Sequence, residues 1–294
     1  MRVVRSLLLK KKGEKCMKAL KKLDFEKIIL YVVLAGIAIL FVLPIIYLVM
    51  GSFKGSSELF REPFQWLPDR FQFDNFKKMF TNIPFLKYFK NTMIIVFFNV
   101  VGSIISCSLV AYGFSRLRWP GRDKVFVLVL VTMILPYQVT MVPLFLFFTK
   151  LGWIGTFLPL TVPCFFGNPF FIFLLRQFFV GVPKELTEAA RIDGANEFTI
   201  YSRLIMPMAK PVLITVAIFA FMRSWNDFIG PLVFLGRDDL YTLSLAASML
   251  KSTYDPNWSV LMALAVVMML PVFIVFFMMQ KYFIQGVAMS GIKG

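Results

Sequence analysis

The stretch NTMIIVFFNVVGSIISCSLVAYGF, from Asn91 to Phe114, carries no charged residue and is mostly apolar. About 20 such residues suffice for an α-helix to cross the hydrocarbon core of a bilayer. Five further runs of the chain have the same character, and one of them is interrupted only by Arg223 and Asp227. The six runs predict an all-α, polytopic membrane protein with six transmembrane helices. We expect these helices at residues 28–50, 91–114, 125–148, 157–179, 208–231 and 258–281.

The distribution of charge favours a membrane protein over a nucleic-acid-binding one. The formal net charge is +16, but ten of the 32 Lys and Arg residues lie in residues 1–27, directly before the first span. Positive charge next to a spanning helix marks the cytoplasmic side. Residues 1–27 are therefore expected to form a basic cytoplasmic tail. An even number of spans then places both ends of the chain in the cytoplasm.

The external segment after the first span and the prolines of the third span predict local structure beyond six straight helices. Residues 51–90 form the longest external segment, and they are rich in Phe and Trp. Aromatic residues concentrate at membrane interfaces, so we expect short amphipathic helices lying on the bilayer, with docking of an external partner as the alternative. In the third span, Pro136 and Pro143 are expected to kink or locally unwind the helix.

Between the fourth and fifth spans lies KELTEAARIDGANEFTIYSRLIMP, residues 184–207, in which seven of 24 residues are charged. Acidic residues near its start and a glycine further on are typical of a short helix that has Pro183 at its first position and stops at Gly194. A second short helix is expected at 196–205. The sequence thus predicts a helix-turn-helix that projects into the cytoplasm.

The charges of this loop allow two interpretations. It could be a solvated helix held by the ion pairs Lys184–Glu188 and Glu188–Arg191, which are spaced to meet on one helix face. Alternatively, its alanines and its second amphipathic helix could form a surface on which another protein docks. Composition alone leaves both interpretations open.

The spacing of the loop resembles the EAA loop of ABC-importer permeases. Glu188-Ala189-Ala190 is followed after three residues by Gly194, and after nine more by Leu204-Ile205-Met206-Pro207. The family pattern reads Glu-Ala-Ala, three residues, Gly, nine residues, Ile-x-Leu-Pro, so Leu204 and Met206 are conservative departures. The segments SFK, AYGFSRLRWPGR, FFIFLLRQFF, AARIDGAN, SWNDF, YTLSL and QGVAMSGIKG also resemble the MalG-like permease subunits of carbohydrate importers.

This resemblance implies the type I ABC importer permease fold, with a permease core at 91–282 and a coupling loop at 183–207. It also implies four partners: a second permease subunit, a cytoplasmic ABC ATPase dimer, an extracytoplasmic solute-binding protein and a carbohydrate substrate. The expected location is a prokaryotic inner membrane. The cytoplasmic tail at 283–294 would be either disordered or directed toward the ATPase dimer. The residues that would engage the ATPase are Glu188, Ala189, Ala190, Gly194, Leu204 and Pro207.

The sequence shows none of the usual signs of catalysis or of cofactor binding. It contains no histidine and no phosphate-binding loop, and the GSFKGSS segment at 51–57 lacks the Lys-Ser/Thr ending such a loop needs. Cys16, Cys107 and Cys164 are scattered without metal or redox spacing, so we interpret them as small packing residues. We therefore expect a non-catalytic transport subunit without cofactor or metal, whose ATP is hydrolysed by a partner chain.

The fifth span contains the polar segment Arg223, Trp225, Asn226 and Asp227. Charges within a membrane usually face the bundle interior or a water-filled path. The segment could be an internal clamp, with Arg223 paired to Asp227 four residues on. It could instead line the translocation path, with Asn226 offering hydrogen bonds and Trp225 a ring for a sugar face.

Three other functions are weighed against a carbohydrate permease. An ABC permease for polyamine, phosphate or another small solute would share the loop at 184–207, although polyamines would favour more acidic residues in the outer spans. An ion-coupled transporter or channel would need intramembrane carboxylates and would not need this loop. A membrane-embedded enzyme would need a catalytic constellation that the sequence lacks.

Overall fold

The computed structural model describes residues 2–63, 65–251 and 257–291, with side chains described for 25–63, 65–251 and 257–280. Over these residues the chain consists of helices, turns and loops, without a strand. The long helices and those that build the spans are α1 (Arg2–Ser52), α4 (Phe85–Ser115), α5 (Arg122–Val131), η1 (Thr132–Ile134), α6 (Tyr137–Lys150), α7 (Leu158–Thr161), η2 (Val162–Phe166), α8 (Pro169–Gly181), α12 (Lys210–Trp225) and α15 (Trp258–Gly291). The short ones between them are α2 (Ser56–Leu59), α3 (Asp74–Asn82), α9 (Lys184–Ile192), α10 (Glu197–Thr199), η3 (Ile200–Ile205), α11 (Met206–Met208), α13 (Ile229–Phe234), η4 (Asp238–Leu240) and α14 (Leu243–Lys251).

The helices account for the predicted spans, some of them in bent form. Four helical segments are long and apolar enough to cross a membrane: Phe25–Ser52, Phe85–Ser115, Leu158–Gly181 and Trp258–Gln280. Two bent pairs, Arg122–Ile134 with Tyr137–Lys150 and Glu197–Met208 with Lys210–Trp225, raise the number to six when each is counted as one span. The bend of 98° in the first pair falls at Pro136, which confirms the predicted break.

Several helix boundaries differ from the sequence-based expectation. α1 is continuous from Arg2 to Ser52, so the expected 1–27 tail and the first span lie on one helix. At the other end, α15 continues to Gly291, through most of the expected 283–294 tail, and the rest of that tail lies outside the described residues. The 51–90 segment contains α2 and α3 as expected, but α4 already begins at Phe85. Capping and packing interactions determine where a helix ends, and the length of an apolar run does not reveal these interactions.

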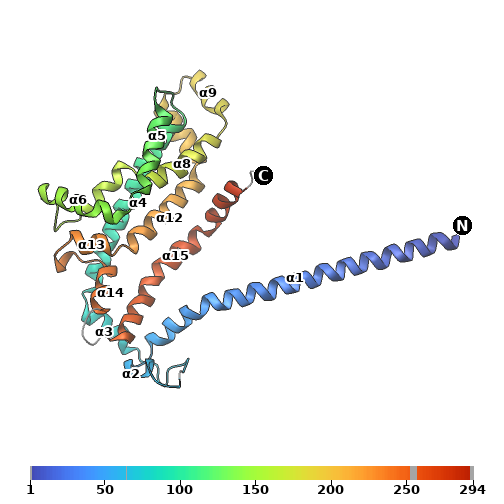
Figure 1. Cartoon of the computed structure of the whole chain (residues 1–294), viewed down its shortest axis with the longest axis horizontal. Coiled ribbons are helices and arrows are strands. Elements are labelled where there is room, and N and C mark those ends of the chain that lie inside the picture. Colours follow the sequence, from blue (N-terminus) through green and yellow to red (C-terminus); the bar gives the residue numbers. More distant parts are fainter. Residues whose placement is uncertain (1, 64, 252–256, 292–294) are drawn as a thin grey trace.

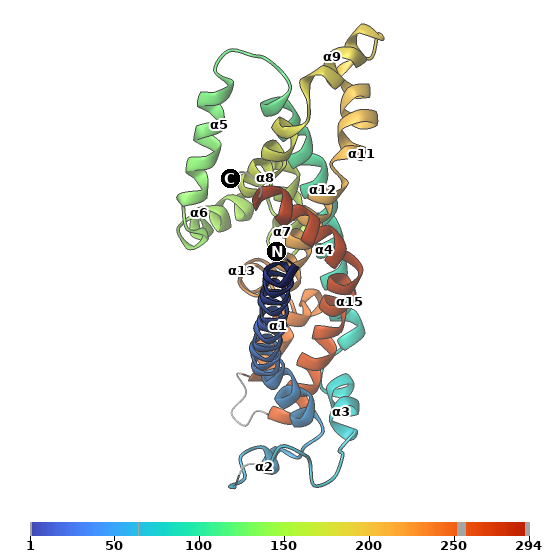
Figure 2. The same cartoon turned by 90° about the vertical axis from the view of Figure 1, so that its right-hand side faces the viewer.

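The bundle is built around α4, which packs against α8 and α12 along its length (Figure 1). α15 lies beside α12, and α1 meets α15 near its Ser52 end and then projects away from the bundle. Figure 2 shows α9 at one end of the molecule and α2 and α3 at the opposite end. One buried cluster joins α4, α8 and α12 towards the α9 end, and a second joins α3, α4, α12, α14 and α15 towards the other. The polar α9 contacts η3, whose residues Ile200, Tyr201 and Ile205 belong to the first of these clusters.

Small and polar residues let α4 approach its neighbours closely. Ser106 donates a hydrogen bond of 2.8 Å to the carbonyl oxygen of Cys164, and Asn99 donates one of 2.8 Å to the carbonyl oxygen of Leu160. Small residues and such interhelical hydrogen bonds hold membrane helices together where lipid removes the hydrophobic driving force. Cys107 is fully buried and forms no disulfide, and its sulfur accepts from the Asn168 N–H at 3.2 Å, whereas the Cys16 side chain lies outside the described residues.

The Gly102→Ala substitution is expected to destabilise the protein, because the added Cβ would lie 2.5 Å from Cys164 Sγ and 3.0 Å from the Phe165 ring. Overpacking of this kind costs about 1–3 kcal/mol. The measurement is thermal unfolding of the purified chain in detergent. Gly113→Ala on the same helix is the matched control, since its Cβ would meet nothing within 4 Å. Equal melting temperatures for the two variants would contradict the close approach at Gly102.

Candidate functional site

Helix α9 has a defined N-cap and a C-terminus whose last carbonyl groups are hydrogen-bonded. It begins after Pro183, which is the N-cap and not the first helical residue that the sequence suggested. At its end, the N–H of Gly194 donates to the Arg191 carbonyl at 3.0 Å and that of Ala195 to the Ala190 carbonyl at 2.9 Å. These are the two hydrogen bonds of a Schellman motif, and Gly194 has the positive φ of +82° that the motif requires. The prediction that Gly194 stops this helix is confirmed.

The two faces of α9 differ sharply in exposure. Thr187 is buried and Ala190 is half-buried against the cluster of α4, α8 and α12. At about 100° per residue, Glu188 and Ala189 fall on the opposite face, and both are exposed. Ala190 is therefore less accessible than Glu188 and Ala189, and its side of α9 packs towards η3 and the first buried cluster. Ile192, with 87% of its surface exposed, completes the free face.

The ion pairs expected within α9 are replaced by a bridge between its end and the rest of the fold. Arg191 Nε donates to Glu197 Oε1 at 2.8 Å, and Tyr112 of α4 donates its hydroxyl to Glu197 Oε2 at 2.6 Å. The bond to Glu197 raises the pKa of Arg191, so this side chain stays charged. Glu188 has no ion pair with Lys184 or Arg191 within the described part of the chain. Its carboxylate is thus available to a partner.

The chain returns to the membrane through a helix that changes type. Asn196 caps it by accepting from the Thr199 N–H at 2.8 Å, and the expected helix at 196–205 is present as α10 and the π-helix η3. Leu204 packs against the buried cluster, while Pro207 is exposed. The helix then bends by 80° into α12. Movement of α9 would therefore reach α12 through one short, continuous connection.

The polar segment at the end of α12 is distributed over different surroundings. The helix ends at Trp225, six residues before the predicted end of the span at 231, and Asp227 Oδ1 then accepts from the Gly230 N–H at 3.0 Å to start α13. Arg223 and Asn226 are exposed, and no ion pair joins Arg223 to Asp227 among the described residues. The Arg223–Asp227 pair that one of the two interpretations allowed is therefore not formed in this structure.

Trp225 lies inside the bundle and does not offer its ring to an open surface. Only 2% of its surface is exposed, its ring stacks on Phe221 at 5.6 Å, and Nε1 donates to the Met268 carbonyl at 3.2 Å. The side chain thus fastens α12 to α15. This position favours the internal-clamp interpretation for Trp225 and leaves Arg223 and Asn226 as the exposed members of the segment.

Sequence reasoning missed the two residues that hold the loop to the bundle, Tyr112 and Glu197. They lie 85 positions apart, so no local pattern pairs them. Nearby, Ser108 and Tyr201 share a hydrogen bond of 2.7 Å between α4 and η3. The sequence held a weak signal of these contacts. A tyrosine and several serines within an apolar span indicate that their hydroxyl groups have hydrogen-bond partners inside the bundle. Among the described residues, no cluster of acidic or sulfur-bearing side chains could hold a metal.

A bundle of four to six apolar spans is the architecture of a multi-pass membrane protein. Residues 99–289 match the family of binding-protein-dependent transport system inner membrane components, and the chain belongs to that family. It is therefore a non-catalytic transport subunit, in agreement with the expectation from its sequence.

Individual relatives cover nearly the whole chain. It is 35% identical over 88% of its length to an arabinooligosaccharide transport system permease of Halalkalibacterium halodurans, covering 94% of that protein. It is 30% identical, again over 88%, to a lactose transport system permease of Rhizobium radiobacter, covering 94% of it. A crystal structure of a bacterial ABC transporter involved in alginate import contains a chain that matches with a TM-score of 0.78 and 26% identity, over 88% of this chain and 97% of that one. This similarity confirms the ABC importer permease fold.

Proposed function

We propose that this chain is the permease subunit of an ATP-driven importer of carbohydrates, and that the free face of α9 receives the ATPase. The observation that carries the proposal is that face itself, where Glu188, Ala189 and Ile192 are exposed on a helix whose other face packs towards η3 and the first buried cluster. A large apolar side chain such as Ile192 on a polar cytoplasmic element gains free energy when a partner covers it. On this proposal the coupling loop is 183–207, with both ends of the chain in the cytoplasm of a prokaryotic cell.

The remaining partners follow from the family and its members. A second permease subunit would complete the translocation path, a solute-binding protein would deliver substrate at the α2–α3 end, and the apolar spans would face lipid. The exposed Arg223 and Asn226 at the end of α12 are our candidates for the path. Relatives described as permeases for arabinooligosaccharides, lactose, diacetylchitobiose and alpha-glucosides support a sugar as the substrate class. A polyamine or phosphate permease is the weaker candidate, since none of these similarities favours it.

The test is uptake by the assembled transporter in proteoliposomes, with the second permease, the ATPase and the binding protein from the same source. We expect ATP-dependent uptake of at least one oligosaccharide from a panel of pentose, glucose and galactose oligomers. Putrescine and phosphate serve as the non-sugar arms. Uptake of either of these, with no sugar transported, would overturn the carbohydrate assignment. Sugar uptake that continues without the ATPase would overturn the importer assignment.

A further inference from the structure

An open cavity of about 490 Å³ lies between the α4–α5 turn and the start of α9, and its lining includes none of the three residues of the free face of α9. Its wall is strongly basic and belongs neither to the path candidates nor to the residues that seat α9. Gly121, with φ of +84°, forms the turn at its base and opens α5. The side chains that line it are Arg118, Trp119, Arg122, Asp123, Lys124 and Lys184.

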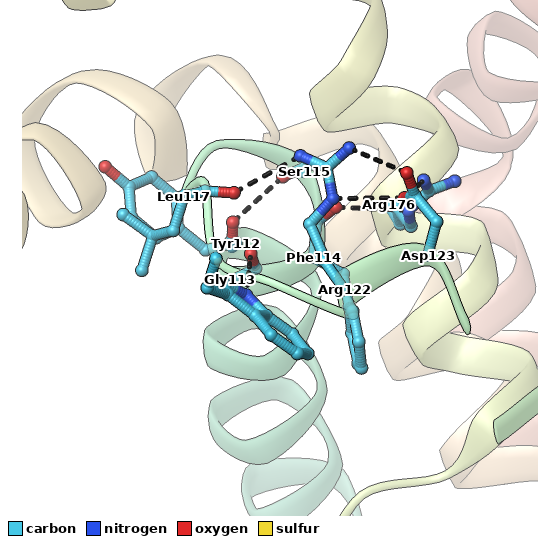
Figure 3. A network of polar contacts seen from close by, with 9 residues as sticks. Tyr112, Gly113, Phe114, Ser115, Leu117, Arg122, Asp123 and Arg176 are labelled. Carbon is cyan, nitrogen blue, oxygen red and sulfur yellow. Dashed lines mark hydrogen bonds and ion pairs between the residues drawn. The ribbon is translucent and has the colours of Figure 1, made fainter. Parts of the chain in front are cut away.

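The single acid of the cavity is already neutralised. Asp123 accepts from Arg122 at 3.0 and 3.3 Å and lies 3.4 Å from Arg176 Nη2, as Figure 3 shows. Arg122 also donates to the Leu117 carbonyl at 3.2 Å, which fixes its guanidinium in the wall. Asp123 therefore orders two guanidinium groups and leaves the cavity with excess positive charge.

Three cations of the cavity face it without a partner. The side-chain nitrogens of Arg118, Lys124 and Lys184 make no hydrogen bond or ion pair with any residue that the structure describes. They come from the α4–α5 turn, the first turn of α5 and the first residue of α9. Like charges brought together in this way repel one another, so an anion with several acceptor oxygens would stabilise them.

Exposed apolar side chains next to the cavity indicate what kind of anion would bind there. Directly after Lys124, the side chains of Val125, Val127 and Leu128 are 40%, 56% and 65% exposed on α5, a helix of the spanning region. Trp119, which also lines the cavity, is 38% exposed, and an indole of this kind is typical of a membrane interface. The basic wall thus continues into an apolar surface, which matches a molecule with an anionic head and acyl chains and does not match a soluble ion.

We propose that this cavity binds the headgroup of an anionic phospholipid, with the phosphate among Arg118, Lys124 and Lys184 and the acyl chains along α5. Basic pockets between spanning helices on the cytoplasmic side recognise such headgroups. Because Lys184 is the first residue of α9, the bound lipid would tie the coupling loop to the α4–α5 turn. None of the residues assigned to ATPase docking takes part in this site. Lipid binding can therefore be tested separately from the proposed function.

The experiment is native mass spectrometry of the assembled transporter in detergent, titrated with phosphatidylglycerol or phosphatidylcholine. The test variant combines Arg118→Gln, Lys124→Gln and Lys184→Gln. Its matched control combines Lys77→Gln, Lys78→Gln and Lys87→Gln, three exposed cations at the α3 end of the molecule. We expect the test variant to lose phosphatidylglycerol affinity by at least about tenfold, since each cation near an anionic headgroup contributes about a factor of five. Neither phosphatidylcholine binding nor the control variant should change.

Three outcomes would overturn the proposal. The first is equal phosphatidylglycerol affinity in test and control variants. The second is displacement of the lipid by millimolar inorganic phosphate, which would show a site for a small soluble anion. The third is loss of the ATPase subunit from the test variant with lipid affinity intact, which would make the cavity a protein-docking surface. Should the triple variant fail to assemble, Lys184→Gln alone, on an exposed side chain, is expected to weaken binding about fivefold by the same measurement.

Discussion

A Glu188→Lys variant is expected to reach the membrane in normal amount and to bind the ATPase at least about 30-fold more weakly, with sugar uptake falling in proportion. The exposed Glu188 carboxylate has no ion pair with the described residues, so the reversal breaks nothing inside the chain. On our proposal it faces a basic group of the ATPase. Truncating one partner of such an interfacial charge pair costs about 2–5 kcal/mol, and a like charge adds repulsion.

The measurement is the affinity of the purified ATPase for the permease pair in nanodiscs, together with uptake in proteoliposomes. Glu62→Lys is the control for net charge, because Glu62 is exposed in the segment next to α2, at the other end of the molecule. Ile192→Asp, on the same face as Glu188, should weaken binding about tenfold or more, since covering a large apolar side chain is worth about 1.5–3 kcal/mol. Unchanged affinity in both Glu188→Lys and Ile192→Asp would show that the ATPase docks elsewhere.

The spans and the loop were predictable because their signals are local. An uncharged run such as 91–114 has few alternatives to a membrane helix, and a polar loop between two such runs must leave the bilayer. Gly194 was assigned correctly as the end of α9 because its positive φ is a property of a single residue. These features depend on composition over a few turns of chain, and the sequence records that composition directly.

The errors arose where the outcome depends on tertiary contacts. The fifth span was expected to run to 231, but α12 ends at Trp225 and Asp227 accepts a hydrogen bond from the Gly230 N–H in the first turn of α13. An Asn-Asp pair is a turn signal that the apolar average concealed. Trp225 was assigned an open position as one alternative, yet its neighbours Phe221 and Met268 enclose it. Arg191 found its partner in Glu197 because the Schellman turn brings them together, whereas helical spacing suggested Glu188.

The bridge through Glu197 leads to the second prediction, that Tyr112→Phe will uncouple ATP hydrolysis from transport. Glu197 holds Arg191 of α9 with one oxygen and Tyr112 of α4 with the other. Removing the Tyr112 hydroxyl leaves α9 joined to the bundle by fewer contacts, and losing a hydrogen bond to a charged group costs about 1.5–3 kcal/mol. We expect about a tenfold fall in sugar transported per ATP hydrolysed, with ATPase affinity within about threefold of the parent, because the free face of α9 is untouched.

A double-mutant cycle separates transmission from simple loss of stability. If Glu197 joins the two helices as one unit, Tyr112→Phe and Arg191→Gln will each lower the transport-to-hydrolysis ratio, and combining them will add little further. Tyr88→Phe is the matched control, since Tyr88 is a buried tyrosine near the other end of α4 whose hydroxyl donates to none of the described residues. It should lower neither the ratio nor the melting temperature. Two results would contradict this prediction: a transport-to-hydrolysis ratio in Tyr112→Phe equal to that of the parent, or losses of this ratio in the double variant that are strictly additive. Either result would show that movement of α9 reaches α12 through η3 alone. The bridge to α4 would then only position the loop.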